Sequence, residues 1–206
     1  MDYSKVALRG SDLIDGTYKR HLGGGRDEWD RRGAFQLHFL QSKGLKPSST
    51  CLDIGCGPLR GGVHIAAYLE PGKYFGYDEN PSFIRAARHV VASAGLTTKE
   101  PGLAVDRSFA GPEERTFDYG LAFSVLNHCD GAARRTFFAN APASFHSRSR
   151  IFITHARWFD PQMLDGSLFS LADRIESGDL SAFGWSKKAG VFPIVELRCS
   201  AAPPPT

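Results

Sequence analysis

Short apolar runs alternate with longer stretches of helical periodicity along most of the chain. The short runs have the length of buried strands, and several end at a glycine or an acid, which is typical of a parallel sheet. The longer stretches repeat apolar residues every three or four positions, which predicts helices with one buried face. The pattern predicts strands over residues 50–55, 73–78, 102–106, 117–126 and 150–156, and helices over residues 27–42, 61–69, 80–94 and 134–143.

This alternation of strands and helices predicts an α/β fold. Parallel neighbours need crossover connections, which the predicted helices supply. We expect a single Rossmann-like domain with a doubly wound, mostly parallel sheet and helices on both faces. The pattern weakens beyond residue 156, where we expect a helix over 170–177 and a sixth strand over 192–199.

Two terminal segments differ from this central domain, which we place at residues 46–200. Residues 1–45 predict cap or lid helices with a hinge at the triple glycine Gly23–Gly25. The residues that flank this glycine run are Tyr18, His21, Arg26 and Trp29. An equally weighted alternative is a fixed capping helix with Trp29 in the core. Residues 201–206, AAPPPT, predict a flexible tail.

Composition narrows the class of protein. The chain has 206 residues, of which 42% are hydrophobic and 23% charged, and these values suit one globular domain. The net charge of +3 comes from scattered basic residues, so we expect no nucleic-acid partner. Four cysteines without zinc spacing predict neither a metal site nor disulfides, which suits a cytoplasmic protein. No apolar run approaches the roughly 18 residues that cross a bilayer, so we expect no membrane partner.

The stretch CLDIGCGPLRGG at residues 51–62 combines the first predicted strand with a glycine-rich turn after it. In an open α/β sheet, ligands bind beyond the carboxyl ends of the strands, and glycines let the backbone approach them closely. We expect Gly55 and Gly57 to form the floor of a nucleoside site, and Asp78, at the end of the next strand, to accept the ribose hydroxyls. The alternative is a tight structural turn beside a solvated acid.

The residues around this turn bear on the choice of nucleoside cofactor. A dinucleotide fingerprint would need a third glycine at position 60, where the chain has Arg60. Asp53, two residues before the first glycine, suits a cation better than a pyrophosphate. A sulfonium and an amino-acid ammonium are such cations.

Over residues 27–156 the chain resembles the class I S-adenosylmethionine-dependent methyltransferases, in particular a bacterial small-molecule branch. The resemblance rests on CLDIGCGPLRGG, YFGYDENP, VDRSF and FDYGLAFSVLNHCD in this order. It implies S-adenosylmethionine as cofactor and S-adenosylhomocysteine as product. The residues that it implies for cofactor binding are Asp53, Ile54, Gly55, Cys56, Gly57, Asp78, Glu79, Asp106, Arg107 and Ser124.

The chain departs from the family pattern at two places. Leu59 stands where the family usually has a third glycine, and it either crowds the methionine side or is offset by Gly61 and Gly62. The family's last, antiparallel strand is not visible before the chain ends. We therefore expect the C-terminal strand region to be truncated.

Two histidines follow predicted strands and are candidates for catalysis. His128 follows the fourth strand, and His155 ends the fifth. Each could act as a general base for an alcohol or phenol acceptor, since the usual pKa of histidine is near neutrality. His128 could equally position the acceptor as a donor or cap the turn at Asp130 and Gly131, and we expect Asp130 to be a helix N-cap.

These observations leave three hypotheses. The first is an enzyme that transfers a methyl group to a small-molecule acceptor, with an oxygen acceptor favoured. The second is a non-catalytic protein that binds S-adenosylmethionine or S-adenosylhomocysteine. The third, which Arg60 and Asp53 disfavour, is an NAD(P)-dependent oxidoreductase. A homodimer would cover the edge of the predicted sixth strand.

Overall fold

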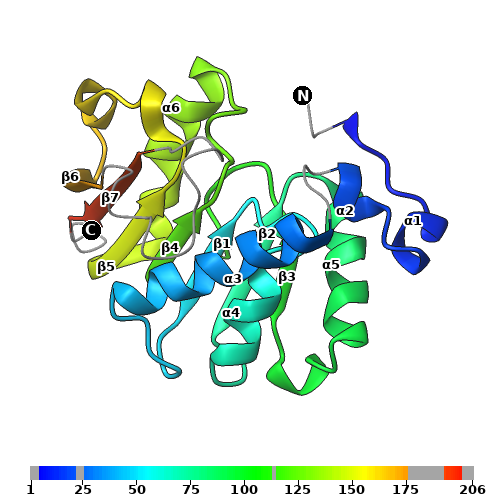
Figure 1. The fold of residues 1–206 in the computed structure, drawn as a ribbon. Helices are drawn as coiled ribbons and strands as arrows, with labels where there is room; N and C mark the ends of the chain where they lie inside the picture. The colour runs from blue at the N-terminus through cyan, green and yellow to red at the C-terminus, as the bar shows by residue number, and fades with distance from the viewer. Residues whose placement is uncertain (1–4, 22–25, 113–114, 176–192, 201–206) are drawn as a thin grey trace. The chain divides into compact units, whose positions relative to one another are not determined.

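The computed structural model describes residues 5–21, 26–112, 115–175 and 193–200. Seven strands form one sheet in the order β3-β2-β1-β4-β5-β7-β6 (Figure 1). The strands are β1 (Cys51–Ile54), β2 (Tyr74–Asp78), β3 (Gly102–Val105), β4 (Phe117–Ala122), β5 (Phe145–Ile153), β6 (Phe169–Ile175) and β7 (Ile194–Cys199). The predicted α/β fold with a mostly parallel sheet is confirmed.

Six α-helices occur within the described residues. They are α1 (Gly10–Ile14), α2 (Tyr18–His21), α3 (Arg26–Ser42), α4 (Gly62–Tyr68), α5 (Pro81–Ser93) and α6 (Gly131–Asn140). The 3-10 helices are η2 (Thr97–Lys99), η3 (Ala141–Ser144), η4 (Ala156–Trp158) and η5 (Pro161–Leu164). The chain divides into two compact units: residues 1–49 with 55–105, called unit 1, and residues 50–54 with 106–206, called unit 2.

In unit 1, strands β2 and β3 run parallel, α4 packs on β2, and α5 packs on both strands. Helix α5 begins where the sequence predicts it. Asn80 is its N-cap and accepts a hydrogen bond from the Ser82 N–H at 2.8 Å, with Pro81 at the first helical position. Gly95, with φ +68°, follows the helix in the left-handed conformation typical of a helix end.

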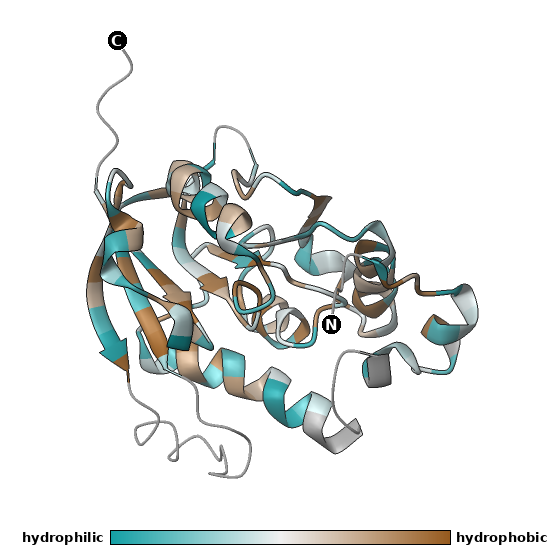
Figure 2. Ribbon diagram, turned by 90° about the horizontal axis from the view of Figure 1, so that it is seen from above, coloured by the Kyte–Doolittle hydropathy of each residue, from teal (hydrophilic) through white to brown (hydrophobic). Residues whose placement is uncertain are grey.

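Helix α3 packs against α4. It carries hydrophilic and hydrophobic residues in alternation along its length (Figure 2), and Phe35, Phe39 and Leu40 are buried. Gly33 on α3 faces the Arg60 carbonyl and the His64 ring so closely that a Cβ atom would collide with both. The glycine therefore sets the close approach of the two helices.

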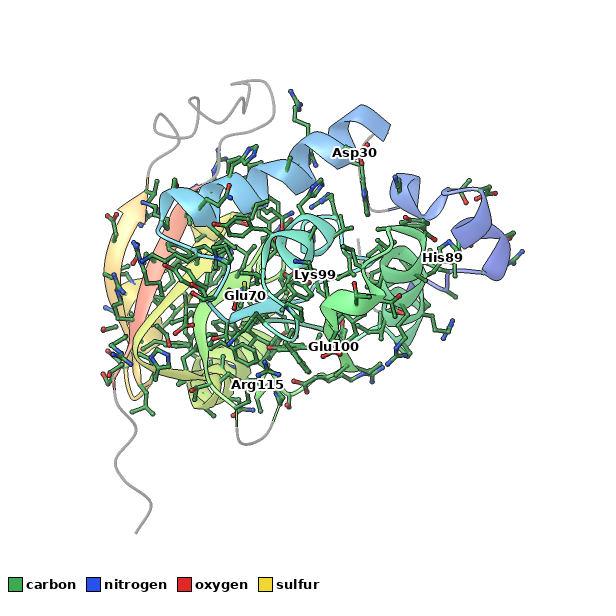
Figure 3. All side chains as sticks on the ribbon, turned by 90° about the horizontal axis from the view of Figure 1, so that it is seen from below. Asp30, Glu70, His89, Lys99, Glu100 and Arg115 are labelled. Carbon is green, nitrogen blue, oxygen red and sulfur yellow. The ribbon has the colours of Figure 1, made fainter. Side chains whose placement is uncertain are left out.

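Two hydrogen bonds of Lys99 connect the segments of unit 1 that precede β2 and β3. Lys99, labelled in Figure 3, donates from Nζ to the Leu69 carbonyl at 2.7 Å. The Gly72 N–H donates to the Lys99 carbonyl at 2.8 Å. These two bonds join the turn before β2 to the segment before β3, and so fix where both strands begin.

In unit 2, β1, β4 and β5 are parallel, whereas β7 is antiparallel to both β5 and β6. Aromatic side chains fill the core beside α6. Phe137 lies within 6.1 Å, between ring centroids, of Phe109, Phe138 and Phe169. Asp130 caps α6 by accepting from the Ala133 N–H at 2.8 Å, so that sequence prediction is confirmed.

The C-terminal predictions are partly wrong. Residues 169–175 form strand β6, not a helix, and β6 supplies the further antiparallel strand that was expected to be missing. The strand predicted over 192–199 is present as β7. Pairing with β7 overrides the local helical preference of this segment, and it buries Phe169 and Ile175 while the residues between them stay exposed. The predicted tail at 201–206 and the hinge Gly23–Gly25 lie outside the described residues.

A buried ionic network holds β7 against β5. The Glu196 carboxylate is nearly inaccessible and accepts from Arg150 Nε and Nη2, each at 2.8 Å. Arg198 lies 2.9 Å from the same carboxylate. Two guanidinium groups thus neutralise a charge that would otherwise be costly to bury.

Several strand and helix boundaries also differ from the sequence prediction. Strand β4 ends at Ala122 rather than residue 126, and β5 runs from Phe145 to Ile153 rather than over 150–156. Helix α6 starts three residues before the predicted position, directly after its N-cap. The early end of β4 places residues 123–128 in a loop.

We predict that Gly33→Ala lowers the free energy of unfolding by about 1–3 kcal/mol, because the added methyl group displaces α3 from α4. The matched control is Gly10→Ala on α1, where a Cβ atom would meet no atom within 4 Å. Urea denaturation of both variants is the measurement. Equal stability of the two variants would contradict the close packing assigned to Gly33.

Candidate functional site

The glycine-rich turn after β1 adopts the conformation that its composition predicts. Gly55 and Gly57 have φ values of +67° and +54°, which glycine adopts without strain. A Cβ atom at Gly57 would meet nothing within 4 Å, so this backbone faces open space. The Cys56 N–H donates to the Tyr77 carbonyl at 2.9 Å and ties the turn to β2.

Leu59 takes the left-handed conformation, with φ +61°, although it has a side chain. Its side chain is buried, and its Cδ2 atom lies 2.7 Å from where a Cβ at Gly62 would stand. At Gly61 a Cβ would collide with the Gln36 side chain. The run LRGG therefore places a leucine in the core of unit 1. Close neighbours leave no room for a Cβ atom at either of its glycines.

The Asp78 carboxylate lies at the end of β2 and holds two backbone groups. Its Oδ2 accepts from the Gly57 N–H at 3.0 Å, and its Oδ1 accepts from the Asn80 N–H at 2.9 Å. A carboxylate offers about four acceptor positions. Two of these are used here, so each oxygen can accept one further hydrogen bond, whereas Glu79 beside it is exposed.

Burial raises the pKa of Asp78 from its ordinary value of 3.8 to about 6. The hydrogen bonds from the Asn80 and Gly57 N–H groups lower this pKa, and the nearby Glu79 charge raises it, but desolvation is the largest effect. The carboxylate is therefore ionised at neutral pH at a cost in stability.

The N-terminal segment is bound to the turn that follows Asp78. Asn80 Nδ2 donates to the Val6 carbonyl at 2.7 Å, and the Ser82 hydroxyl donates to the same carbonyl at 3.1 Å. The Leu8 N–H donates to Ser82 Oγ at 3.3 Å. Sequence analysis missed this pair of polar residues, whose only signal was the N-cap role of Asn80.

The aromatic residues predicted to belong to a cap or lid lie in a hydrophobic cluster of unit 1. Trp29 and Tyr18 are buried and their rings meet edge to face, 5.8 Å apart, beside Leu8 and Phe83. The Arg60 guanidinium lies 5.5 Å from the centre of the Trp29 ring. The side chains of His21 and Arg26 lie outside the described part of the structure.

In unit 2, two predicted site residues are buried within β1. Asp53 is 3% exposed and Ile54 is fully buried. Asp106 stabilises its own loop: its Oδ1 accepts from the N–H and the hydroxyl of Ser108, both at 2.7 Å, and its Oδ2 accepts from the Gly111 N–H at 3.2 Å. Arg107 is exposed.

Ser124 and His155 come together at the ends of β4 and β5. Both have left-handed backbones, each with φ +59°. The Thr154 hydroxyl lies between them, since the Ser124 N–H donates to Thr154 Oγ1 at 2.9 Å and His155 Nδ1 lies 3.0 Å from the same oxygen. Sequence analysis missed Thr154, because a threonine at the end of a strand is an ordinary strand residue.

His128 is exposed and lies in the loop after β4. Its Nε2 is 3.1 Å from the side-chain nitrogen of Asn127. Partial desolvation of the ring lowers the pKa of His128, although its side chain is largely at the surface.

Two further findings concern the described residues as a whole. Their histidine, cysteine and acidic side chains form no group of three that could hold a metal ion. Every helix among them is too short or too polar to cross a membrane.

A family model described as a methyltransferase domain matches residues 52–145. This span begins in β1, includes the glycine-rich turn and Asp78, and reaches the first residue of β5. None of the curated proteins matches the chain in sequence.

Solved structures share the fold at low sequence identity. A magnesium protoporphyrin IX methyltransferase from Synechocystis PCC 6803, solved with bound S-adenosylmethionine, is 16% identical with a TM-score of 0.66, covering 95% of this chain and 100% of that one. The glycopeptide N-methyltransferase MtfA is 14% identical with a TM-score of 0.64, covering 81% and 90%. A TehB-like S-adenosylmethionine-dependent methyltransferase from Corynebacterium glutamicum ATCC 13032 Kitasato is 15% identical with a TM-score of 0.62, covering 93% and 100%.

The family match and the shared fold confirm the resemblance inferred from the sequence motifs. At these identities the solved structures establish the fold alone. The roles of individual site residues therefore depend on the geometry described above.

We predict that Asp78 makes unfolding depend on pH. Because its folded-state pKa of about 6 exceeds the ordinary 3.8, its contribution to stability is fully present below pH 3.8 and is lost as pH rises through 6. The loss is about 3 kcal/mol for this group. Asp78→Asn does not titrate, so the difference in unfolding free energy between wild type and variant should change by about that amount between pH 4 and pH 8.

Urea denaturation across this pH range measures the difference. The exposed Asp165, replaced by asparagine, serves as the control for the substitution itself. A constant difference for Asp78→Asn would contradict the raised pKa.

Proposed function

We propose that this chain, which carries a methyltransferase domain, is a class I S-adenosylmethionine-dependent methyltransferase that transfers a methyl group to a small-molecule acceptor. The observation that carries the proposal is the Asp78 carboxylate bound to the Gly57 and Asn80 N–H groups. This arrangement combines an acceptor for a ribose diol with a glycine backbone that faces open space. The solved structures with this fold include one with bound S-adenosylmethionine, which supports the same cofactor here.

The residues of unit 1 fit the ribose of such a cofactor. Each Asp78 oxygen has one acceptor position left for a hydroxyl group, and Gly57 presents no side chain to obstruct it. Cys56 and Gly55 continue the same turn, and Glu79 follows Asp78 at the surface. In unit 2 we assign cofactor contacts to Asp53, Ile54, Asp106, Arg107 and Ser124, as the family motifs imply.

When bound, the cofactor supplies a methyl group on a positively charged sulfur that leaves as a neutral thioether. The protein must hold the acceptor atom in line with that methyl group. Positioning of this kind can lower the activation barrier by roughly 7–11 kcal/mol. The acceptor is a small molecule, with oxygen as the favoured atom. The relatives in fold act on a magnesium protoporphyrin and on a glycopeptide, which supports a small-molecule or natural-product acceptor.

The non-catalytic alternative loses one of the two observations that motivated it. It depended partly on a missing C-terminal strand, and the sheet contains both β6 and β7. Leu59 has a left-handed backbone and a buried side chain, which supports the alternative in which it does not crowd the turn. A cytoplasmic location and a homodimer stay predictions.

We predict that the protein binds S-adenosylmethionine and S-adenosylhomocysteine in isothermal titration calorimetry, and that Asp78→Ala weakens both affinities by about 10- to 100-fold. The loss follows from removing a charged acceptor for two hydroxyl groups. Binding to the wild type should also weaken below pH 6, where Asp78 becomes protonated.

The matched control is Asp165→Ala, an exposed acid outside the site that should bind as the wild type does. Retained affinity in Asp78→Ala, or binding of NAD in place of S-adenosylmethionine, would refute the proposed site. Transfer of a labelled methyl group to a panel of carboxylates, phenols, alcohols, amines and thiols then separates an enzyme from a binding protein. Binding without transfer to any of them would favour the binding protein.

A further inference from the structure

A groove of about 420 Å³ lies beside the edge strand β3 in unit 1. Its walls come from the second half of α5, from the segment around η2 and from the start of β3. This volume lies in the range of binding sites for small molecules. The lining combines an apolar part, formed by Val91, Pro101 and Leu103, with the polar side chains of Arg88, Thr97 and Glu100.

The groove is separate from the Asp78 site. Strands β2 and β3 run parallel, and Asp78 pairs with Val105, the last residue of β3. The groove is lined instead by Pro101 and Leu103, around the start of that strand. The two sites therefore lie toward opposite ends of the same strand pair, within one compact unit.

Two opposite charges line the groove without pairing with each other. The Arg88 guanidinium donates from Nη2 to the Leu103 carbonyl at 3.2 Å, which holds it against the start of β3. An arginine has five N–H donors, and this bond uses one of them. The Glu100 carboxylate forms no ion pair or hydrogen bond with the described residues. Both charges can therefore bind a ligand.

Glu100, labelled in Figure 3, has a strained backbone. Its φ and ψ angles of 49° and 49° are left-handed, although it precedes Pro101 and a residue before proline is normally extended. The Glu100 N–H donates to the Thr97 carbonyl at 3.1 Å and closes η2. Glycine would adopt this conformation without strain. A glutamate held there against its backbone preference is typical of a functional site.

We propose that this groove is a second binding site, whose ligand is an α-amino acid with an aliphatic side chain. Arg88 binds the carboxylate of the amino acid, and Glu100 binds its ammonium group, both through charge-assisted hydrogen bonds. Val91, Pro101 and Leu103 contact the aliphatic side chain. The site does not depend on the proposed methyl transfer.

Other classes of ligand fit this lining less well. A simple anion would meet the Glu100 carboxylate, and a simple cation would meet the Arg88 guanidinium. An extended peptide would have to pair with the edge of β3, where the Leu103 carbonyl is already bound to Arg88. A small molecule that carries both charges next to an apolar body matches the whole lining.

NMR of the full-length protein labelled with nitrogen-15 tests the ligand class. The probes are L-leucine and two analogues that each lack one charge: 4-methylpentanoate has no ammonium group, and 3-methylbutylamine has no carboxylate. We expect millimolar L-leucine to shift backbone amides of residues 88–92 and 97–103. Titrations should show each analogue binding about 3- to 10-fold more weakly. The absence of shifts in these residues, or equal binding of the three probes, overturns the proposal.

Substitutions of the two charged residues test their roles in a crossed design. Arg88→Gln should weaken binding of L-leucine by about 3- to 10-fold but should not weaken binding of 3-methylbutylamine, because that amine has no carboxylate. Glu100→Gln should weaken L-leucine to the same extent but should not weaken 4-methylpentanoate. The controls are Arg85→Gln and Glu70→Gln, since both residues are exposed and lie outside the groove, and these variants should bind as the wild type does. Losses that do not follow the charge of the probe overturn the assignment.

Glu100→Gly separates a role in binding from a role in folding. We expect a higher urea midpoint, because glycine is unstrained at this position, together with the same loss of L-leucine affinity as in Glu100→Gln. Full affinity in this variant overturns the proposal, and so does a loss of affinity accompanied by a lower midpoint.

Competition with S-adenosylhomocysteine distinguishes the groove from the Asp78 site. We expect L-leucine to bind equally well in the presence and absence of saturating S-adenosylhomocysteine. Displacement of L-leucine would place the amino acid in the cofactor site and overturn the proposal. If S-adenosylhomocysteine itself does not bind, the proposed function fails, while the crossed substitutions still decide the role of the groove.

Discussion

The bond between the Asp78 carboxylate and the Gly57 N–H is the constraint on which unit 1 depends. It joins the end of β2 to the glycine-rich turn, while the second oxygen of the same carboxylate holds the N–H of Asn80 at the start of α5. Asn80 and Ser82 in turn bind the Val6 carbonyl of the N-terminal segment. One acid thus orders the turn, the helix start and the N-terminal segment before any ligand is present.

This arrangement has a cost that a purely structural acid would avoid. Desolvation raises the pKa of Asp78 to about 6, so ionisation at neutral pH opposes folding. A protonated or amide side chain could hold one of the N–H groups more cheaply. Retaining a charged carboxylate with unused acceptor positions is reasonable if those positions serve a ligand, because a charged acceptor makes stronger hydrogen bonds than a neutral one. The electrostatic cost therefore supports a binding role over a structural one.

The sequence predicted the parallel part of the sheet because glycine, proline and acidic residues mark its strand ends, as at Gly55, Pro81 and Asp78. It failed at β6, where Leu171 and Ala172 favour a helix locally and only pairing with β7 imposes a strand. The Glu196 network between β5 and β7 joins residues 46 positions apart in the chain, so no local pattern could indicate it. Thr154 was missed for a related reason: its importance comes from its partners Ser124 and His155, and the residue type alone does not reveal them.

The two units hold residues with strained, left-handed backbones in different ways. In unit 1, Leu59 accepts a left-handed backbone and recovers the cost by burying its side chain against Gly62. In unit 2, Ser124 and His155 accept the same conformation, but they are held by one buried hydroxyl group and remain only partly buried. Hydrophobic burial therefore explains Leu59 without reference to function. It does not explain Ser124 and His155, where the buried hydroxyl group of Thr154 holds a strained pair of polar residues in place.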